Sequence, residues 1–343
     1  MTGIPTVTDS DLCTETIAVL GGGAMGTACA SILAQKGTHD VRLWVRNPEF
    51  ATRIDQTREN ARLLPGVCLP STICVTSDPG LALHNSTIVL VCVPTKGIRA
   101  ACSTVGKYLP ADTLLVSAVK GIETDTLVRP SEMLQELLGK RPVVVLGGPC
   151  HAEELARRLP TSVVAACEDL PHAERIQDAF SCETFRVYSN TDQRGVELGG
   201  ALKNVIAIAA GICDGLQLGD NAKSALITRG LAEMARFCEA MNVPPETLTG
   251  LAGVGDLIAT CGSQHSRNRR VGELLGQGRS LAQIEASMEA VAEGVLTARS
   301  VQTIAHEKHI DIPIADTLCR VLFEGHSVRD ATVDLMNRPL RSE

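Results

Sequence analysis

The sequence predicts an α/β fold in which a doubly wound, mostly parallel sheet is followed by an all-helical C-terminal domain. Two observations lead to this prediction. In the first half of the chain, short apolar runs typical of buried strands alternate with segments of helical periodicity. From about residue 195 onward the strand signals disappear, and helical periods interrupted by Gly and Pro follow. We therefore expect two domains, residues 1–194 and residues 195–343.

Composition and charge narrow the class of protein. The chain is 44% hydrophobic and 21% charged with a net charge of −7, which is typical of a soluble protein and argues against binding to nucleic acid. Its 13 cysteines include no C-x-x-C pair, so we expect reduced thiols, no metal and a cytoplasmic location. The longest apolar runs, such as "TIVLVCVP", are too short to cross a bilayer, so no membrane insertion is expected.

The elements of the first domain can be placed in order. Residues 16–20 form an apolar run, residues 21–26 form a Gly-rich turn, and the helical pattern that follows ends at Gly37. A helical pattern over residues 125–139 separates two later apolar runs. We expect strands over residues 16–20, 40–46, 87–93, 113–119, 142–148, 161–167 and 185–189.

The turn "GGGAMG" has the G-x-G-x-x-G pattern of a Rossmann-like dinucleotide-binding turn. Gly21 permits the tight turn, Gly23 lets the backbone approach a pyrophosphate, and Gly26 allows the helix to pack closely on the strand. A purely structural turn is the alternative, but the strand–turn–helix setting favours the cofactor. The second strand ends at Arg46 rather than at a carboxylate, which favours NADP(H), with NAD(H) or an ordinary surface arginine as alternatives.

Two apolar segments of the second half each hold a single charge. Lys203 is the only charged residue in "LGGALKNVIAIAAG", and an apolar setting should depress the pKa of its ammonium group. Gly199 and Gly200, one turn earlier, leave space for a ligand or another backbone. Asp256 is alone in "AGVGDLIATC", and Lys203 is its natural partner because a buried carboxylate needs a cation. The structural alternatives are a snorkelling lysine and a helix-capping aspartate.

Three further features can contribute to a site. Lys120 and "GGPC" (residues 147–150) each follow an apolar strand, where parallel sheets bind ligands. The segment "SQHSRNRR" holds three arginines around Asn268, which suits a phosphate or carboxylate, or else forms a solvated face. We expect helices over residues 198–216, 221–241, 280–294, 297–309 and 314–325.

Taken together, these blocks resemble the NAD(P)-dependent glycerol-3-phosphate dehydrogenases, in particular the bacterial form. The resemblance covers nearly the whole chain, from "VLGGGAMGTACA" through "GGALKNVIAI", "DGLQLGDNAKSALITRGLAEM" and "GVGDLIATC" to "SRNRR" and "EGVLTARSV". It implies the reversible reduction of dihydroxyacetone phosphate to sn-glycerol 3-phosphate, which feeds glycerophospholipid synthesis. It also implies a small phosphate-bearing substrate and a homodimer.

The resemblance implies roles for individual residues. The catalytic group would be Lys203 as proton donor and acceptor, Lys120 in contact with substrate and cofactor, and Asp256 beside them. Further substrate contacts would be Gly148, Cys150, Ser266, Arg267 and Asn268. Cofactor contacts would include Ala24, Met25, Arg46, Lys120, Ala152, Arg267, Val291 and Glu293. The family usually has Ser or Thr where this chain has Cys150, and a thiol is a weaker hydrogen-bond donor, so substrate affinity is where this departure should act.

In the expected reaction, Lys203 gives a proton to the alkoxide that forms on the ketone oxygen, while Arg267 and Asn268 anchor the phosphate. Two other functions fit less well. A dehydrogenase for 3-hydroxy acids would also use a lysine in its helical domain, but the arginine–asparagine cluster suits a phosphate dianion better than a carboxylate. A non-catalytic nucleotide sensor gives no reason for a buried lysine beside glycines.

Overall fold

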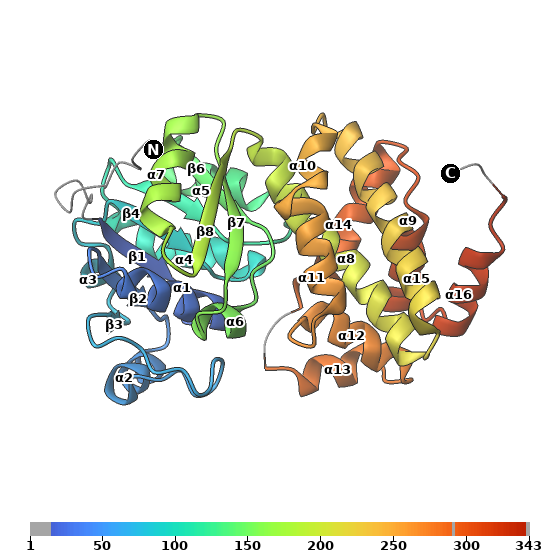
Figure 1. The fold of residues 1–343 in the computed structure, drawn as a ribbon, viewed down its shortest axis with the longest axis horizontal. Coiled ribbons are helices and arrows are strands. Elements are labelled where there is room, and N and C mark those ends of the chain that lie inside the picture. The colour runs from blue at the N-terminus through green and yellow to red at the C-terminus, as the bar shows by residue number, and fades with distance from the viewer. Residues whose placement is uncertain (1–14, 290–291, 341–343) are drawn as a thin grey trace, which may run out of the picture.

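A computed structural model describes residues 15–289 and 292–340 of the chain. Figure 1 shows a sheet flanked by helices on the left and a separate group of helices on the right. The strands are β1 (Thr16–Leu20), β2 (Asp40–Trp44), β3 (Cys74–Thr76), β4 (Ile88–Val91), β5 (Leu114–Ser117), β6 (Val143–Gly147), β7 (Thr161–Ala166) and β8 (Phe185–Asn190). The helices of this half are α1 (Ala24–Gln35), α2 (Pro48–Thr57), α3 (Pro79–Leu83), α4 (Ile98–Val105), α5 (Pro130–Leu138), α6 (Ala152–Ala156) and α7 (Leu170–Phe180).

The group on the right contains the helices that follow the last described strand. They are α8 (Gln193–Gly215), α9 (Gly219–Ala240), α10 (Pro245–Thr249), α11 (Asp256–Gly262), α12 (Arg267–Gly276), α13 (Leu281–Ser287), α14 (Glu293–Glu307), α15 (Pro313–Phe323) and α16 (Val328–Met336). A π-helical turn, η4 (Leu251–Gly255), precedes α11. The predicted fold class, a mostly parallel sheet followed by helices, is confirmed.

The sheet has the order β3-β2-β1-β4-β5-β6-β7-β8, and its neighbours are parallel except for the antiparallel pair β6 and β7. The chain adds β2 and β3 on one side of β1, and then β4 and the later strands on the other side, so the strand order reverses between β1 and β4. Ligands of open α/β sheets bind at such a switch point, beyond the carboxyl ends of the strands. The Gly-rich turn after β1 therefore lies where a dinucleotide is expected.

Successive side chains of β1 enter two different cores because a strand alternates its faces. Ile17 and Val19 pack with α1, α6 and α7, whereas Ala18 and Leu20 pack with α3, α4 and α5. A third core lies within the helical half, and Ile122 from the sheet half joins it. Helices on both faces make the sheet doubly wound, as predicted.

Helix α8 forms the centre of the third core, and its residues from Gly195 to Cys213 are buried. By length and composition it could cross a membrane, so the expectation that the apolar runs are too short is wrong for this segment. The most apolar window of α8 is, however, entirely buried inside the protein, as in the core helix of a globular fold. The predicted division at residues 194 and 195 falls within the first turn of this helix.

The predicted helix over residues 280–294 is wrong in its second part. Helix α13 ends at Ser287 and α14 begins at Glu293. The backbone N–H of Gly294 donates to Asn268 Oδ1 over 2.9 Å, and a Cβ at Gly294 would lie 2.6 Å from the carbonyl oxygen of Asn204. These contacts with α8 and α12 set where α14 starts, and local periodicity does not report them.

Helices α8 and α12 pack closely because glycines face each other across the contact. A Cβ added at Gly272 of α12 would collide with the carbonyl oxygen of Ile208, which belongs to the α8 backbone. We expect Gly272→Ala to lower the free energy of unfolding by about 2 kcal/mol or more, because two helix backbones must separate. Urea unfolding measures this change.

Gly262→Ala is the matched control, since in the part of the chain that the structure describes no heavy atom beyond the neighbouring backbone lies within 4 Å of a Cβ at that helical position. It should change the free energy of unfolding by less than about 1 kcal/mol. Equal effects of the two substitutions would contradict the steric explanation.

Candidate active site

The Gly-rich turn has the geometry of a dinucleotide cradle. Gly21 has a φ of +120°, and a Cβ at Gly26 would overlap the carbonyl oxygen of Gly21. At Gly23, the N-cap of α1, no atom of the described residues outside the adjacent backbone lies within 4 Å of an added Cβ, and none of their side chains caps the helix. The first N–H groups of α1, in Ala24 and Met25, therefore face open space, which fits a pyrophosphate.

Arg46 lies beside this turn. β1 and β2 are parallel with Leu20 opposite Trp44, and the Val45 side chain lies 2.7 Å from the position of a Cβ at Gly22. Arg46 is the next residue and is exposed. Its position suits a charged group on the ribose next to the pyrophosphate.

Glu293 and Arg267 approach the same edge of the sheet from the helical half. The Glu293 carboxylate accepts hydrogen bonds from the N–H and Oγ1 of Thr95, over 3.2 and 2.6 Å. Burial raises the pKa of Glu293, while the Thr95 bonds and the positive charge of Arg267 oppose this shift. Ala152 is the first residue of α6, on the sheet side, and Val291 lies outside the described residues.

The two lysines and the aspartate form one cluster. Asp256 Oδ2 lies 2.7 Å from Lys120 Nζ, and Asp256 Oδ1 lies 3.0 Å from Lys203 Nζ. Thr260 Oγ1 accepts from Lys203 over 2.6 Å and donates to Asp256 over 3.2 Å. Lys120 Nζ also donates to the carbonyl oxygen of Gly148 over 2.8 Å. One carboxylate is therefore shared by two ammonium groups from opposite halves of the chain.

Burial lowers the pKa of Lys203 to about 8, and the Lys120 charge acts in the same direction while Asp256 opposes it. Burial alone would raise the pKa of Asp256, but the two ammonium groups outweigh burial and hold it below its usual value. The depressed lysine pKa agrees with the prediction from its apolar segment. Neither structural alternative fits, since Lys203 is 5% exposed and the Asp256 side chain accepts bonds from lysines rather than from a helix N-terminus.

The glycines before Lys203 do not leave a ligand-sized gap. A Cβ at Gly199 would lie 2.7 Å from the carbonyl oxygen of Ala252, and a Cβ at Gly200 would meet Lys120 Cγ at 3.5 Å. Gly199 therefore serves the approach of another backbone, and the Lys120 side chain occupies the space at Gly200. Sequence reasoning missed this contact, because Lys120 and α8 are far apart in the chain.

The residues of the segment "SRNRR" have different partners in the structure. Arg269 and Arg270 pair with Glu273 of their own helix, and Arg269 also pairs with Asp214 over 2.8 Å. Ser266 caps α12 by accepting from the N–H of Arg269. Asn268 donates to Asn204 over 2.8 Å and is buried. Arg267, which is exposed, is the member of the cluster best placed for an external anion.

Gly148 and Cys150 lie in the loop between β6 and α6. Gly148 has a φ of +113°, a conformation that side chains rarely adopt, and this turns its carbonyl oxygen toward Lys120. The Cys150 thiol lies 3.9 Å from the sulfur of Met25, and burial raises its pKa to about 12. Cys150 is therefore a neutral thiol between the Gly-rich turn and the lysine cluster.

Known proteins are similar to this chain over nearly its full length. Residues 16–173 match the N-terminal model, and residues 192–333 the C-terminal model, of the NAD-dependent glycerol-3-phosphate dehydrogenases. A glycerol-3-phosphate dehydrogenase (NAD(P)+) of Chlorobium phaeobacteroides (strain BS1) is 46% identical over 330 residues, which is 95% of this chain and 98% of the relative. The glycerol-3-phosphate dehydrogenase (NAD(P)+) of Bacillus cereus (strain AH187) is 48% identical over 330 residues, which is 95% of this chain and 97% of the relative.

The fold comparison agrees with the sequence comparison. A crystal structure of glycerol-3-phosphate dehydrogenase from Coxiella burnetii has a TM-score of 0.91 and 36% identity, covering 95% of this chain and 99% of its own. The two family models match the sheet half and the helical half in order, and their matched ranges contain the Gly-rich turn after β1 and helix α8 of this chain. The chain therefore belongs to the NAD-dependent glycerol-3-phosphate dehydrogenase family.

Proposed function

We propose that Lys203 is the acid–base group of the NAD(P)-dependent glycerol-3-phosphate dehydrogenase reaction that this protein catalyses. The observation that carries the proposal is the shared carboxylate, where Lys120 and Lys203 both approach Asp256 within 3.0 Å. The reaction is the reversible reduction of dihydroxyacetone phosphate to sn-glycerol 3-phosphate. A nicotinamide cofactor held at the Gly-rich turn would supply or accept the hydride.

The residues of the chain supply the proton and the charge. With a pKa of about 8, Lys203 can give a proton to the substrate oxygen near neutral pH and take it back in the reverse direction. Asp256 holds Lys203 in place, and the ammonium group of Lys120 stabilises negative charge on the same oxygen. Substrate contacts are assigned to Gly148, Cys150, Ser266, Arg267 and Asn268, with Arg267 binding the phosphate.

An absorbance assay at the nicotinamide band tests this function. Purified protein should oxidise NADPH or NADH only when dihydroxyacetone phosphate is present. Glycerol 3-phosphate and oxidised cofactor should give the reverse reaction. Cofactor binding without turnover would exclude the acid–base role of the cluster and would favour a nucleotide sensor.

We propose NADP(H) as the preferred cofactor, supported by the exposed Arg46 next to the Gly-rich turn. Arg46→Asp is expected to lower kcat/KM for NADPH by about tenfold or more and to leave that for NADH within about threefold, since a 2′-phosphate loses its cation. Steady-state titrations with both cofactors measure the ratio. Arg53→Asp on the exposed part of α2 is the control and should leave the ratio unchanged. An unchanged ratio in Arg46→Asp would contradict the assignment.

The remaining assignments rest on the family resemblance and on the fold. We assign residues 1–194 to cofactor binding and residues 195–343 to substrate binding, supported by the separate cores of the two halves. The product supplies glycerophospholipid synthesis, and the protein is a cytoplasmic homodimer in this proposal. Sedimentation velocity tests the homodimer, and a monomer at micromolar concentration would contradict it.

A further inference from the structure

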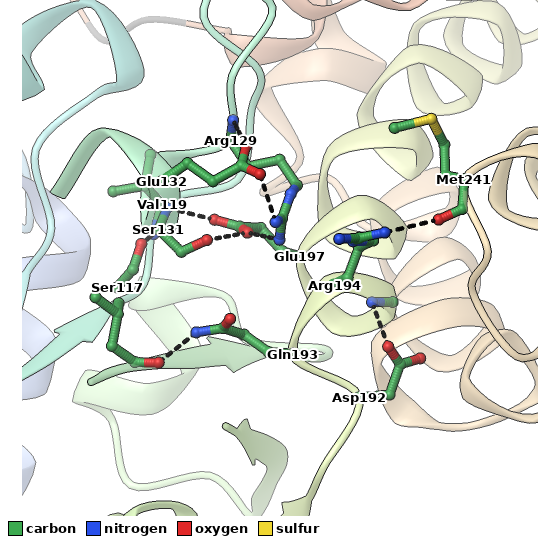
Figure 2. A network of polar contacts seen from close by, with 12 residues as sticks. Ser117, Val119, Arg129, Ser131, Glu132, Asp192, Gln193, Arg194, Glu197 and Met241 are labelled. Carbon is green, nitrogen blue, oxygen red and sulfur yellow. Dashed lines mark hydrogen bonds and ion pairs between the residues drawn. The ribbon is translucent and has the colours of Figure 1, made fainter. Parts of the chain in front are cut away.

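We propose that Glu197 is a positioning residue for the reaction, because through Arg129 and Ser131 it fixes Lys120 against the helix that carries Lys203. Figure 2 shows Glu197 of α8 pointing at the N-terminus of α5, where both partners lie. This inference rests on the proposed role of Lys203, but its test has a different readout.

The Glu197 carboxylate is fully satisfied by donors from the sheet half. Oε1 accepts from the N–H of Ser131 over 2.8 Å, while Oε2 accepts from Ser131 Oγ over 2.6 Å and from Arg129 Nη1 over 2.8 Å. The side chain of Glu197 is 1% exposed and that of Arg129 is 11% exposed. Glu132 holds Arg129 from the other side, accepting from its backbone N–H and from Nη2. The ion pair is therefore directional and closed to solvent.

One face of α8 holds both ends of the segment that leads from Lys120 to Ser131. Glu197, Gly200 and Asn204 lie at positions i, i+3 and i+7, which share a helix face. Asn204 Nδ2 donates to the carbonyl oxygen of Lys120 over 3.2 Å, and the Lys120 side chain lies over Gly200, where an added Cβ would be 3.5 Å from Lys120 Cγ. The two attachments are seven residues apart, about 10 Å along the helix axis. Together they determine the register of Lys120 relative to α8.

The register matters because Lys120 and Lys203 share Asp256. A shift of the segment would move Lys120 Nζ from its 2.7 Å contact with Asp256, while Lys203 stays on α8. A buried ion pair adds little net stability compared with well-packed apolar side chains, but it specifies one arrangement of its partners. The three directional bonds of Glu197 fit this positioning role better than a purely stabilising one.

Glu197→Gln tests the proposal, because it keeps the side-chain size but removes the charge that holds Arg129. The groups that face Lys203 are Asp256, Lys120 and Cys261, with His151 and Cys150 farther away. Since the Lys120 charge lowers the pKa of Lys203, withdrawal of Lys120 should raise it. In the pH profile of kcat for glycerol 3-phosphate oxidation, we expect the acidic limb to move to higher pH by about half a unit or more. We expect kcat itself to fall about tenfold.

Two further variants separate positioning from folding. Arg194→Gln is the matched control, because Arg194 lies on the same helix but donates to the carbonyl oxygen of Met241 within the helical half (Figure 2). It should leave both kcat and the pH limb as in the wild type. Arg129→Lys keeps the charge and should retain most of kcat. If Glu197→Gln does not fold, Ser131→Ala removes one of the three donors and should shift the limb in the same direction by less.

An unmoved pH limb in a folded Glu197→Gln or Ser131→Ala protein would overturn the proposal, even if kcat or stability falls. A limb that moves equally in Arg194→Gln would also overturn it. The acid–base role of Lys203 fails separately, if a variant without this lysine keeps its turnover.

Discussion

Lys203→Met is expected to lower kcat by about 10³-fold or more in both directions, while the dissociation constant of NADPH stays within about twofold of the wild type. The variant loses the group that exchanges the proton, and Lys120 remains to bind Asp256. The Gly-rich turn lies in the sheet half and keeps its geometry. Steady-state kinetics and fluorescence titration of the cofactor measure the two effects.

Lys223→Met is the control, because Lys223 pairs with Asp214 in the helical half over 2.8 Å and contacts no residue of the cluster. It should keep wild-type turnover. Turnover of Lys203→Met within tenfold of the wild type would exclude Lys203 as the acid–base group.

The same Lys203→Met variant should be at least as stable as the wild type at pH 7. Burial lowers the pKa of Lys203 from 10.5 to about 8, so below pH 8 the folded protein holds an ammonium group that water would solvate better. Between about pH 8 and 10.5 the unfolded chain binds more protons at this site than the folded chain does. The free energy of unfolding should therefore rise with pH in the wild type, and Lys203→Met should lack this contribution. Urea unfolding across this range measures the difference.

Sequence reasoning was sufficient for the elements whose signals are local. The apolar run of β1 and the Gly-rich turn are short local patterns, and β1 has the predicted bounds. The helical period of α8 predicts its end to within one residue, but the helix begins at Gln193, five residues before the predicted start. β3 has three residues at the edge of the sheet, which is too short for a periodic signal. The break between α13 and α14 depends on contacts of Gly294 with Asn204 and Asn268, which no local pattern records.

The candidate site likewise combines residues that local sequence patterns predict with contacts that such patterns do not record. Lys203 and Asp256 could be paired because each is a single charge in an apolar segment, and such charges need each other. The bond of Lys120 to Asp256 joins residues 136 positions apart, and nothing near Lys120 in the sequence indicates it. The link between Arg129 and Glu197 is hidden for a related reason, since "VELGG" gives no sign of a partner 68 residues earlier.

Asp256→Asn is the second substitution for which we expect a large loss of activity. It removes the carboxylate that binds the ammonium groups of both Lys120 and Lys203. Asp256 opposes the burial that lowers the pKa of Lys203, so without it that pKa should fall below about 8. Less Lys203 is then protonated at neutral pH, so kcat for reduction should fall about 10²-fold and its optimum should move to lower pH. In the pH profile of kcat for oxidation, the acidic limb should also move to lower pH. This shift is opposite to the one expected for Glu197→Gln. Full pH profiles in both directions measure these changes.

Stability should follow the charge of Asp256. Its pKa is lowered in the folded protein, so its contribution is complete at neutral pH and is lost as the pH falls through the folded value. Asp256→Asn should therefore cost about 3 kcal/mol at pH 7, and the difference from the wild type should shrink in acid. Asp214→Asn is the matched control, since Asp214 also binds two cations, Lys223 and Arg269, but its side chain is 22% exposed. Asp214 is more exposed than Asp256, whose side chain is 2% exposed, so the loss of Asp214 should cost less than the loss of Asp256 and leave the pH optimum unchanged. A wild-type optimum in Asp256→Asn would mean that the carboxylate holds the two lysines in place without tuning the proton on Lys203.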